Sequence, residues 1–202
     1  MKIMIGITGF SGAGKTDLST CIGKKFPENI LVISQDNYYF GCDPAQAEVY
    51  NFDQIAALDI DKLYRDLVSL RNNEQIELPI YNFKLHRRTG YRQICPESII
   101  LLEGHLVFLE EKIRDLFDLL AFVYVDPYLA LLRRIRRDVI SRERDVTQIL
   151  NRYEQFVAST NKEIEKLIDF SDIVIPYYKR NEKAMEVLLA FIAFRLQNNK
   201  NV

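Results

Sequence analysis

Short apolar runs bounded by polar residues recur along the chain and give the first indication of its fold. They occupy residues 3–7, 30–33, 99–102, 119–125 and 173–175. Because these runs hold few polar positions, we expect each to form a strand that is buried on both faces, as in a parallel sheet. The pattern therefore predicts a mainly parallel sheet of five strands.

Helical patterns alternate with these runs, over residues 16–25, 60–72, 127–138, 145–168 and 182–196. Alternation of this kind is typical of an α/β protein in which helices cover both faces of the sheet. No linker rich in Gly, Ser or Pro divides the chain, so we expect one domain over residues 1–202. Ligands of such sheets bind beyond the carboxyl ends of the strands, and the residues that follow each strand are therefore the candidates for chemistry.

One segment breaks the alternation. Residues 76–94, "IELPIYNFKLHRRTGYRQI", contain two short extended stretches around a basic turn. They predict a β-hairpin insertion that projects from the sheet. The alternative is an edge hairpin with no functional role.

The net charge and the cysteine content indicate which binding partners and which cellular compartment to expect. The net charge is −1, so no global field draws the protein to nucleic acid or to an anionic membrane, and we expect neither as a partner. Three widely spaced cysteines fit neither a disulfide framework nor a zinc site, which favours a reducing cytoplasm. The most apolar run, residues 185–194, is about half the ~20 residues needed to cross a bilayer.

A glycine-rich loop follows the first apolar run. Residues 9–16, "GFSGAGKT", fit the pattern G-x-x-x-x-G-K-[ST], in which backbone N–H groups turn inward around the phosphates of a nucleotide. The lysine of this pattern reaches the β- and γ-phosphates, and the hydroxyl that follows it binds Mg²⁺. We therefore expect nucleotide contacts from Gly9, Ser11, Gly12, Ala13, Gly14, Lys15 and Thr16.

Acidic residues end two other predicted strands. Asp36 follows the second strand and, if that strand neighbours the first, its carboxylate faces the γ-phosphate, where it can accept a proton from an attacking hydroxyl. Glu103 ends the third strand and suits a water-mediated Mg²⁺ contact. The alternatives are a turn residue for Asp36, and a helix cap or turn residue for Glu103.

Arginines are concentrated in "LLRRIRRDVISRERD". Such a run is usually a solvated helix face, but beside a phosphate loop it favours a mobile lid over residues 133–144. Its guanidinium groups would neutralise the charge that develops during phosphoryl transfer and would exclude water. By contrast, we expect His105 to be a packing or turn residue and Cys21 to lie in the core, while Cys42 has no partner that marks a nucleophile.

Read in order, these stretches resemble the uridine kinase family of P-loop kinases, whose relatives include phosphoribulokinase and bacterial pantothenate kinase. The resemblance covers residues 3 to 181 and is carried by "GFSGAGKT", "ISQDNYY", "YNFDQIAALD", "LPIYNF", "IILLEGH", "RRIRRDVISRERD" and "DIVIPYYKRN". The first motif is shared by many NTPases, whereas the ordered set is specific to the family.

The resemblance implies roles for individual residues. Asp36 matches the catalytic base that takes the proton from the 5′-hydroxyl of a nucleoside, and Lys15 and Arg137 complete the catalytic set. Arg142 matches a nucleotide contact of the lid. The implied substrate-binding residues are Asp53 and Arg134 at the ribose hydroxyls, Tyr81 and His86 at the pyrimidine base, and Tyr39, Arg144 and Arg152 elsewhere in the acceptor pocket. The resemblance further implies ATP or GTP with Mg²⁺ as cofactors, bound at Thr16 and Glu103, and a homo-oligomer.

The sequence also departs from the family pattern, mainly on the acceptor side. Gln54 and Ile55 stand where the family usually has His-Pro, and Asn82 replaces an aspartate. Glu143 replaces a glycine between two arginines, and Arg152 replaces a glutamine. The base, metal and phosphate positions are retained, so the sequence supports phosphoryl transfer more strongly than it supports uridine as the acceptor.

The leading hypothesis is an ATP-dependent kinase that phosphorylates the 5′-hydroxyl of uridine or cytidine. Within the same class, the acceptor could be another ribosyl compound, such as nicotinamide riboside, or a pantothenate-like alcohol. A nucleotide-binding regulatory protein without transfer activity is the alternative from another class. A GTPase switch is disfavoured, because the guanine-reading N-K-x-D element is absent and the nearest match, "NKEI" at Asn161, ends in isoleucine.

Overall fold

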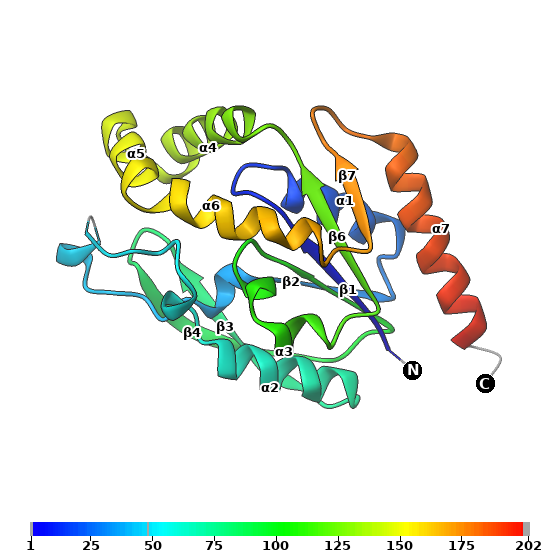
Figure 1. Ribbon diagram of the computed structural model, residues 1–202. Coiled ribbons are helices and arrows are strands. Elements are labelled where there is room, and N and C mark those ends of the chain that lie inside the picture. The colour runs from blue at the N-terminus through cyan, green and yellow to red at the C-terminus, as the bar shows by residue number, and fades with distance from the viewer. Residues whose placement is uncertain (1, 48, 200–202) are drawn as a thin grey trace.

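The computed structural model describes residues 2–47 and 49–199 of the chain. Its centre is a parallel five-stranded sheet with the strand order β2-β5-β1-β6-β7 (Figure 1). The strands are β1 (Ile3–Thr8), β2 (Ile30–Ser34), β5 (Ile99–Glu103), β6 (Leu119–Tyr124) and β7 (Ile173–Pro176). Every residue of β1 and β5 is buried, which is why the two strands read as unbroken apolar runs. The predicted α/β fold class is confirmed.

Helices cover both faces of the sheet, as the alternating pattern predicts. Figure 1 shows α6 and α3 crossing in front of the strands, with α1 on the opposite face and α7 beside it. The longer helices are α1 (Lys15–Lys25), α2 (Ile60–Arg71), α4 (Pro127–Arg142), α6 (Ala158–Glu165) and α7 (Glu182–Asn199), and the shorter ones are α3 (Glu111–Arg114) and α5 (Val146–Arg152). None of the described helices is long and apolar enough to cross a membrane.

The strand order corrects one expectation from the sequence. The second strand does not neighbour the first, because β2 pairs with β5 and β5 lies between β2 and β1. Apolar runs show which segments are strands but do not encode which strands pair. Asp36 still reaches the carboxyl edge of the sheet, because it lies on a 3₁₀ turn (Gln35–Tyr38) that extends β2.

The segment 145–168, expected as one helix, is helical but not uniform. Between α5 and α6 lies one π-helical turn (Tyr153–Val157), and a 3₁₀ turn (Lys166–Ile168) follows α6. A π turn widens a helix locally, and such turns occur frequently at functional sites. This one begins directly after Arg152, which lines the pocket described below.

Strands β3 (Ile76–Asn82) and β4 (Arg87–Ile94) form the antiparallel hairpin expected over residues 76–94. The hairpin is tied to the segment that follows β2. Arg88 of β4 donates to the carbonyls of Tyr38 and Tyr39 at 2.9 and 3.0 Å and forms an ion pair with Asp59 at 3.0 Å. Asn37 donates to the carbonyl of Pro79 at 2.9 Å. These contacts hold the hairpin against the segment that follows the carboxyl end of β2.

Candidate active site

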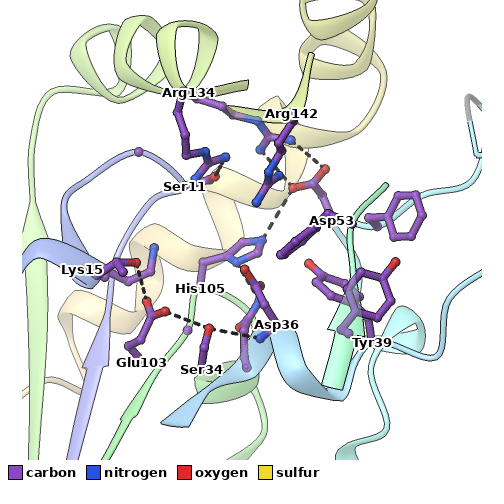
Figure 2. A pocket seen from close by; sticks show the side chains of 18 of the residues that line it. Ser11, Lys15, Ser34, Asp36, Tyr39, Asp53, Glu103, His105, Arg134 and Arg142 are labelled. Carbon is purple, nitrogen blue, oxygen red and sulfur yellow. Dashed lines mark hydrogen bonds and ion pairs between the residues drawn. The ribbon is translucent and has the colours of Figure 1, made fainter. Parts of the chain in front are cut away.

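A cavity of about 290 Å³ lies at the carboxyl edge of the sheet and gathers most of the residues that the sequence singled out. The phosphate loop, the ends of β2 and β5, the hairpin and the helices α4 and α5 all contribute to its wall (Figure 2). Of the expected site residues, those that line the cavity are Ser11, Gly12, Gly14, Lys15, Thr16, Asp36, Tyr39, Asp53, Tyr81, His86, Glu103, Arg134, Arg137, Arg142, Arg144 and Arg152.

Gly9 and Ala13 lie in the phosphate loop but not on the wall of the cavity. Gly9 has φ of 136°, and a Cβ there would come within 2.3 Å of the Val123 carbonyl oxygen, so this position requires glycine. Ala13 is fully buried, and its carbonyl accepts a hydrogen bond from Arg133. Both residues therefore support the conformation of the loop without lining the cavity.

The phosphate loop leads directly into α1. Gly14, with φ of 110°, is the residue that precedes the helix, so the free backbone N–H groups of the first turn face the cavity edge, an arrangement that favours phosphate. The ammonium group of Lys15 donates to the carbonyls of Gly9 and Phe10, both at 3.0 Å. Burial lowers the pKa of Lys15 to about 8, against the opposing effect of the Glu103 carboxylate.

Oxygen atoms suited to Mg²⁺ lie next to this loop. The hydroxyl of Thr16 donates to Glu103 at 3.3 Å, and the hydroxyl of Ser34 donates to the other carboxylate oxygen at 2.8 Å. Burial raises the pKa of Glu103, which a nearby cation would counteract. The described residues contain no cluster of three or more His, Cys, Asp or Glu that could hold a metal. The donor set therefore fits Mg²⁺ that is bound by one or two protein oxygens, with phosphates and water as further ligands.

Asp36 is held at the start of the 3₁₀ turn after β2. Its backbone N–H donates to the Ser34 hydroxyl at 3.3 Å, which links the Asp36 backbone to Glu103 through Ser34. Figure 2 shows Asp36 between the side of the cavity that carries Lys15 and the side that carries Tyr39. This carboxylate is therefore exposed on the cavity wall, where it can accept a hydrogen bond or a proton from a bound group.

Asp53 and Arg134 form a buried, bidentate ion pair. The two guanidinium nitrogens lie 3.1 and 3.2 Å from the two carboxylate oxygens, and the exposed fractions are 5% and 6%. Burial alone would raise the pKa of Asp53, but the Arg134 guanidinium holds it well below its usual range. The carboxylate is therefore ionised throughout the physiological range.

Asp138 is a centre of charge compensation that the sequence analysis did not identify. Its side chain is fully buried on α4 and accepts a hydrogen bond from Nε of Arg137 at 2.8 Å. Three further guanidinium groups lie 3.6–3.8 Å from its carboxylate, those of Arg134, Arg142 and Arg144. Burial opposes ionisation, yet these arginines keep the pKa of Asp138 below its ordinary value. The signal in the sequence is its spacing, four residues after Arg134 and four before Arg142.

Aromatic side chains line one side of the cavity. His86 stacks on Phe52 with ring centroids 5.4 Å apart, and Tyr39 contacts Phe52 and Tyr81 at 5.8 and 5.4 Å. Arg152 donates to the carbonyls of Ala47 and Tyr50, both at 3.0 Å, and its guanidinium lies 5.5 Å from the ring centre of Phe52. Phe52 and His86 are stacked, whereas Tyr39 is edge-on to Phe52 and tilted against Tyr81, so the rings form an angled, partly polar aromatic wall.

The end of α4 meets the tip of the hairpin across the cavity. The guanidinium of Arg142 lies over the ring of Phe83 at 4.3 Å, and Lys84 forms an ion pair with Glu143 at 2.8 Å. We call these four residues the lid–hairpin contact. The mobility of this contact stays a prediction. The assignment of residues 133–144 as a lid also stays a prediction.

The parallel sheet, the phosphate loop and the helix that follows it define a P-loop kinase fold. The chain belongs to the phosphoribulokinase/uridine kinase family, whose model matches residues 4–184. It is similar to the uridine kinase of Latilactobacillus sakei subsp. sakei (strain 23K), with 35% identity over 98% of this chain and 96% of that protein.

Two further comparisons extend this similarity. The chloroplastic uridine/cytidine kinase UKL1 of Arabidopsis thaliana is 33% identical over 96% of this chain and 41% of that protein. The solved structure of phosphoribulokinase from Rhodobacter spheroides superposes with a TM-score of 0.56 at 17% identity, covering 80% of this chain and 67% of that chain. At that identity, the superposition shows the shared fold alone.

Some residues of the cavity wall were missed by the sequence analysis. Phe52 and Phe83 flank motif residues and could have been identified from the aromatic content of "YNFDQ" and "YNF". His105 was expected to serve packing or a turn, but it lines the cavity and its Nε2 lies 3.6 Å from Asp53. No local pattern reveals this, because its partners are distant in sequence. Cys21, expected in the core, is half-buried and packs against it.

Proposed function

We propose that this protein is an ATP-dependent kinase that transfers the γ-phosphoryl group to the 5′-hydroxyl of uridine or cytidine. The observation that carries the proposal is the single cavity that brings a phosphate loop, the Asp36 carboxylate and an aromatic acceptor wall together. The curated relatives named above, a uridine kinase and a uridine/cytidine kinase, support the same acceptor.

In this proposal, the backbone of the phosphate loop and Lys15 hold the β- and γ-phosphates. Asp36 accepts the proton of the 5′-hydroxyl as that oxygen attacks phosphorus. Arg137, whose guanidinium lies 3.5 Å from the Ser11 hydroxyl, stabilises the negative charge on the transferring group. The aromatic wall and the Asp53–Arg134 pair orient the nucleoside.

Mg²⁺, bound by Thr16 and through water by Glu103, would supply charge neutralisation at the β- and γ-phosphate oxygens. The donor can be ATP or GTP, since both present the same triphosphate to the loop. Arg142 contacts the nucleotide, while Arg144 and Arg152 close the acceptor side. We further propose a cytoplasmic homo-oligomer with no nucleic-acid or membrane partner, in keeping with the net charge of −1.

The departures at Gln54, Asn82, Glu143 and Arg152 make the acceptor the part of this proposal that most needs a test. A panel of uridine, cytidine, nicotinamide riboside and pantothenate, with ADP release and product mass as readouts, separates the candidates. Turnover of another alcohol without turnover of either pyrimidine nucleoside would reassign the acceptor. Nucleotide binding with no product from any alcohol would indicate a regulatory protein.

The base is tested with Asp36→Asn. We expect kcat to fall by at least about 10²-fold, because the transition state loses its proton acceptor, while Kd for the nucleotide stays near that of the wild type. The matched control is Asp169→Asn, which makes the same change at an exposed position outside the cavity. Equal turnover by the Asp36 variant and the wild type would contradict the assignment.

A further inference from the structure

The imidazole of His105 is buried in the wall of the cavity, with 9% of the residue exposed. It comes from the loop after β5, and Figure 2 shows it in the middle of the cavity wall, with the Asp53 side chain above it and Asp36 below. The sequence motifs assign no role to this side chain. Its two ring nitrogens have very different surroundings.

The first ring nitrogen, Nδ1, lies 2.8 Å from the amide nitrogen of Gln35. The orientation of that amide is fixed by its other end, because Oε1 of Gln35 accepts the backbone N–H groups of Leu106 and Val107 at 2.9 and 3.3 Å. The approach depends on Gly104, where a Cβ would come within 2.4 Å of Oε1. Since oxygen must face the two N–H groups, the NH₂ group faces His105 and donates to Nδ1.

An accepting Nδ1 carries no proton, so the proton of the neutral ring is on Nε2. Nε2 is buried, and among the described residues it has no hydrogen-bond partner. Asp53 Oδ1, at 3.6 Å, is beyond hydrogen-bonding distance. A buried donor without an acceptor costs free energy, and in native proteins such a group usually serves a ligand or another function.

We propose that His105 is a specificity-determining residue of the acceptor site, which recognises a hydroxyl group of the acceptor together with Asp53. The Nε2–H of His105 donates to the oxygen of that hydroxyl, and the Asp53 carboxylate accepts its proton. A hydroxyl satisfies both groups at once, because it is a donor and an acceptor. A hydrogen atom at the same carbon satisfies neither. The inference rests on the proposed function, because it describes how the enzyme recognises the acceptor.

The position of the ring proton can be measured without any substrate. The chain contains two histidines, so ¹⁵N NMR of the imidazole nitrogens gives a simple spectrum, and the signals lost in His105→Gln belong to His105. We expect Nδ1 to be unprotonated and Nε2 to be protonated. A proton on Nδ1 would overturn the inference at its first step.

The role in recognition is tested with a pair of variants. His105→Asn retains a side-chain oxygen near the position of Nδ1, which can accept from Gln35, but lacks the distal donor. His105→Gln is long enough to place an N–H donor near the position of Nε2. We expect the asparagine variant to lose recognition and the glutamine variant to recover a large part of it. Thermal unfolding of both variants checks that they are folded.

The measurement is kcat/KM for uridine, 2′-deoxyuridine and 3′-deoxyuridine. For His105→Asn we expect a loss of roughly 3- to 10-fold with uridine, the effect of one neutral hydrogen bond. We also expect this variant to discriminate less than the wild type, by a similar factor, against at least one of the two deoxynucleosides. Equal losses with all three substrates, which a merely structural role would give, would overturn the inference. A wild-type enzyme that does not phosphorylate uridine would instead overturn the proposed function and would leave the NMR result to decide the tautomer.

Discussion

Asp138 is the residue whose removal should most affect both stability and activity. Its carboxylate compensates four arginines, and an amide in its place would leave them facing one another in a buried setting. We expect Asp138→Asn to lower the free energy of unfolding by about 3 kcal/mol, the range found when one partner of a buried ion pair is removed. The loss should appear in urea unfolding curves.

We expect kcat of the same variant to fall as well, because Arg137 and Arg142 lose the anion that orients them. The control is Asp169→Asn at an exposed position of the same charge type. A change in unfolding free energy within about 0.5 kcal/mol, which is usual for surface substitutions, would show that Asp138 does not stabilise the folded state in this way.

The Asp53–Arg134 pair predicts a specific dependence of stability on pH. Although burial opposes it, Arg134 keeps the folded-state pKa of Asp53 below the unfolded value of about 3.9. The unfolded state therefore binds the proton first as the pH falls, so the contribution of the pair is fully present above about pH 5 and is lost below it. We expect the free energy of unfolding to fall less between pH 5 and pH 3 in Asp53→Asn than in the wild type. Parallel slopes in denaturant titrations at pH 7, 5, 4 and 3 would contradict this assignment.

At the scale of residues, sequence reasoning located the groups whose positions are set locally. The phosphate loop, Asp36 and Glu103 could be placed because each lies at or within two residues of the carboxyl end of a strand, and strand ends meet at one edge of a parallel sheet. Asp138 and His105 could not be assigned, because their surroundings come from distant segments. Asp138 lies among charged residues that suggest a solvated face, and the orientation of His105 depends on Gln35, 70 residues away.

At the scale of elements, the end of α4 carries a backbone feature that substitution can test. Glu143 is the residue after the helix and has φ of 55°, a left-handed conformation that is unfavourable for residues with a Cβ. We expect Glu143→Gly to melt about 2–4 °C higher than Glu143→Ala, because both lose the contact with Lys84 but only glycine relieves the backbone. Differential scanning fluorimetry of the two variants checks this. Equal melting temperatures would show that the left-handed backbone is not costly here.

The elements themselves were predicted well where burial decides the pattern. The five apolar runs became the five strands of the parallel sheet, with ends shifted by one residue. Burial on both faces explains this for β1, β5 and β6, but the expectation is wrong for the edge strands β2 and β7, which are only partly buried. The order of the strands and the π-helical turn after Arg152 were not predictable in this way. Both depend on how connections cross the sheet and on the packing around the cavity, which hydrophobic periodicity does not record.

At the scale of the whole molecule, the cavity joins segments from most of the chain, from the phosphate loop to α5. A ligand that binds only the folded state therefore stabilises the entire domain. With nucleotide and Mg²⁺ at about 100 times Kd, we expect the free energy of unfolding to rise by roughly 2.7 kcal/mol. Removal of the metal with EDTA should reduce the gain, because the γ-phosphate then faces the Glu103 carboxylate without a cation between them.

Lys15→Met separates the stability of the fold from nucleotide binding. Burial lowers the pKa of Lys15 to about 8, so keeping the ammonium charged at pH 7 costs free energy in the ligand-free protein. The unfolded lysine, with a pKa near 10.4, does not carry this cost. We therefore expect Lys15→Met to be at least as stable as the wild type without ligand and to lose most of the stabilisation by nucleotide and Mg²⁺. Thermal unfolding with and without nucleotide measures both effects, and Lys25→Met, at an exposed position at the end of the same helix, is the control. A variant that is less stable than the wild type but is still stabilised by nucleotide would place Lys15 in the fold rather than at the phosphates.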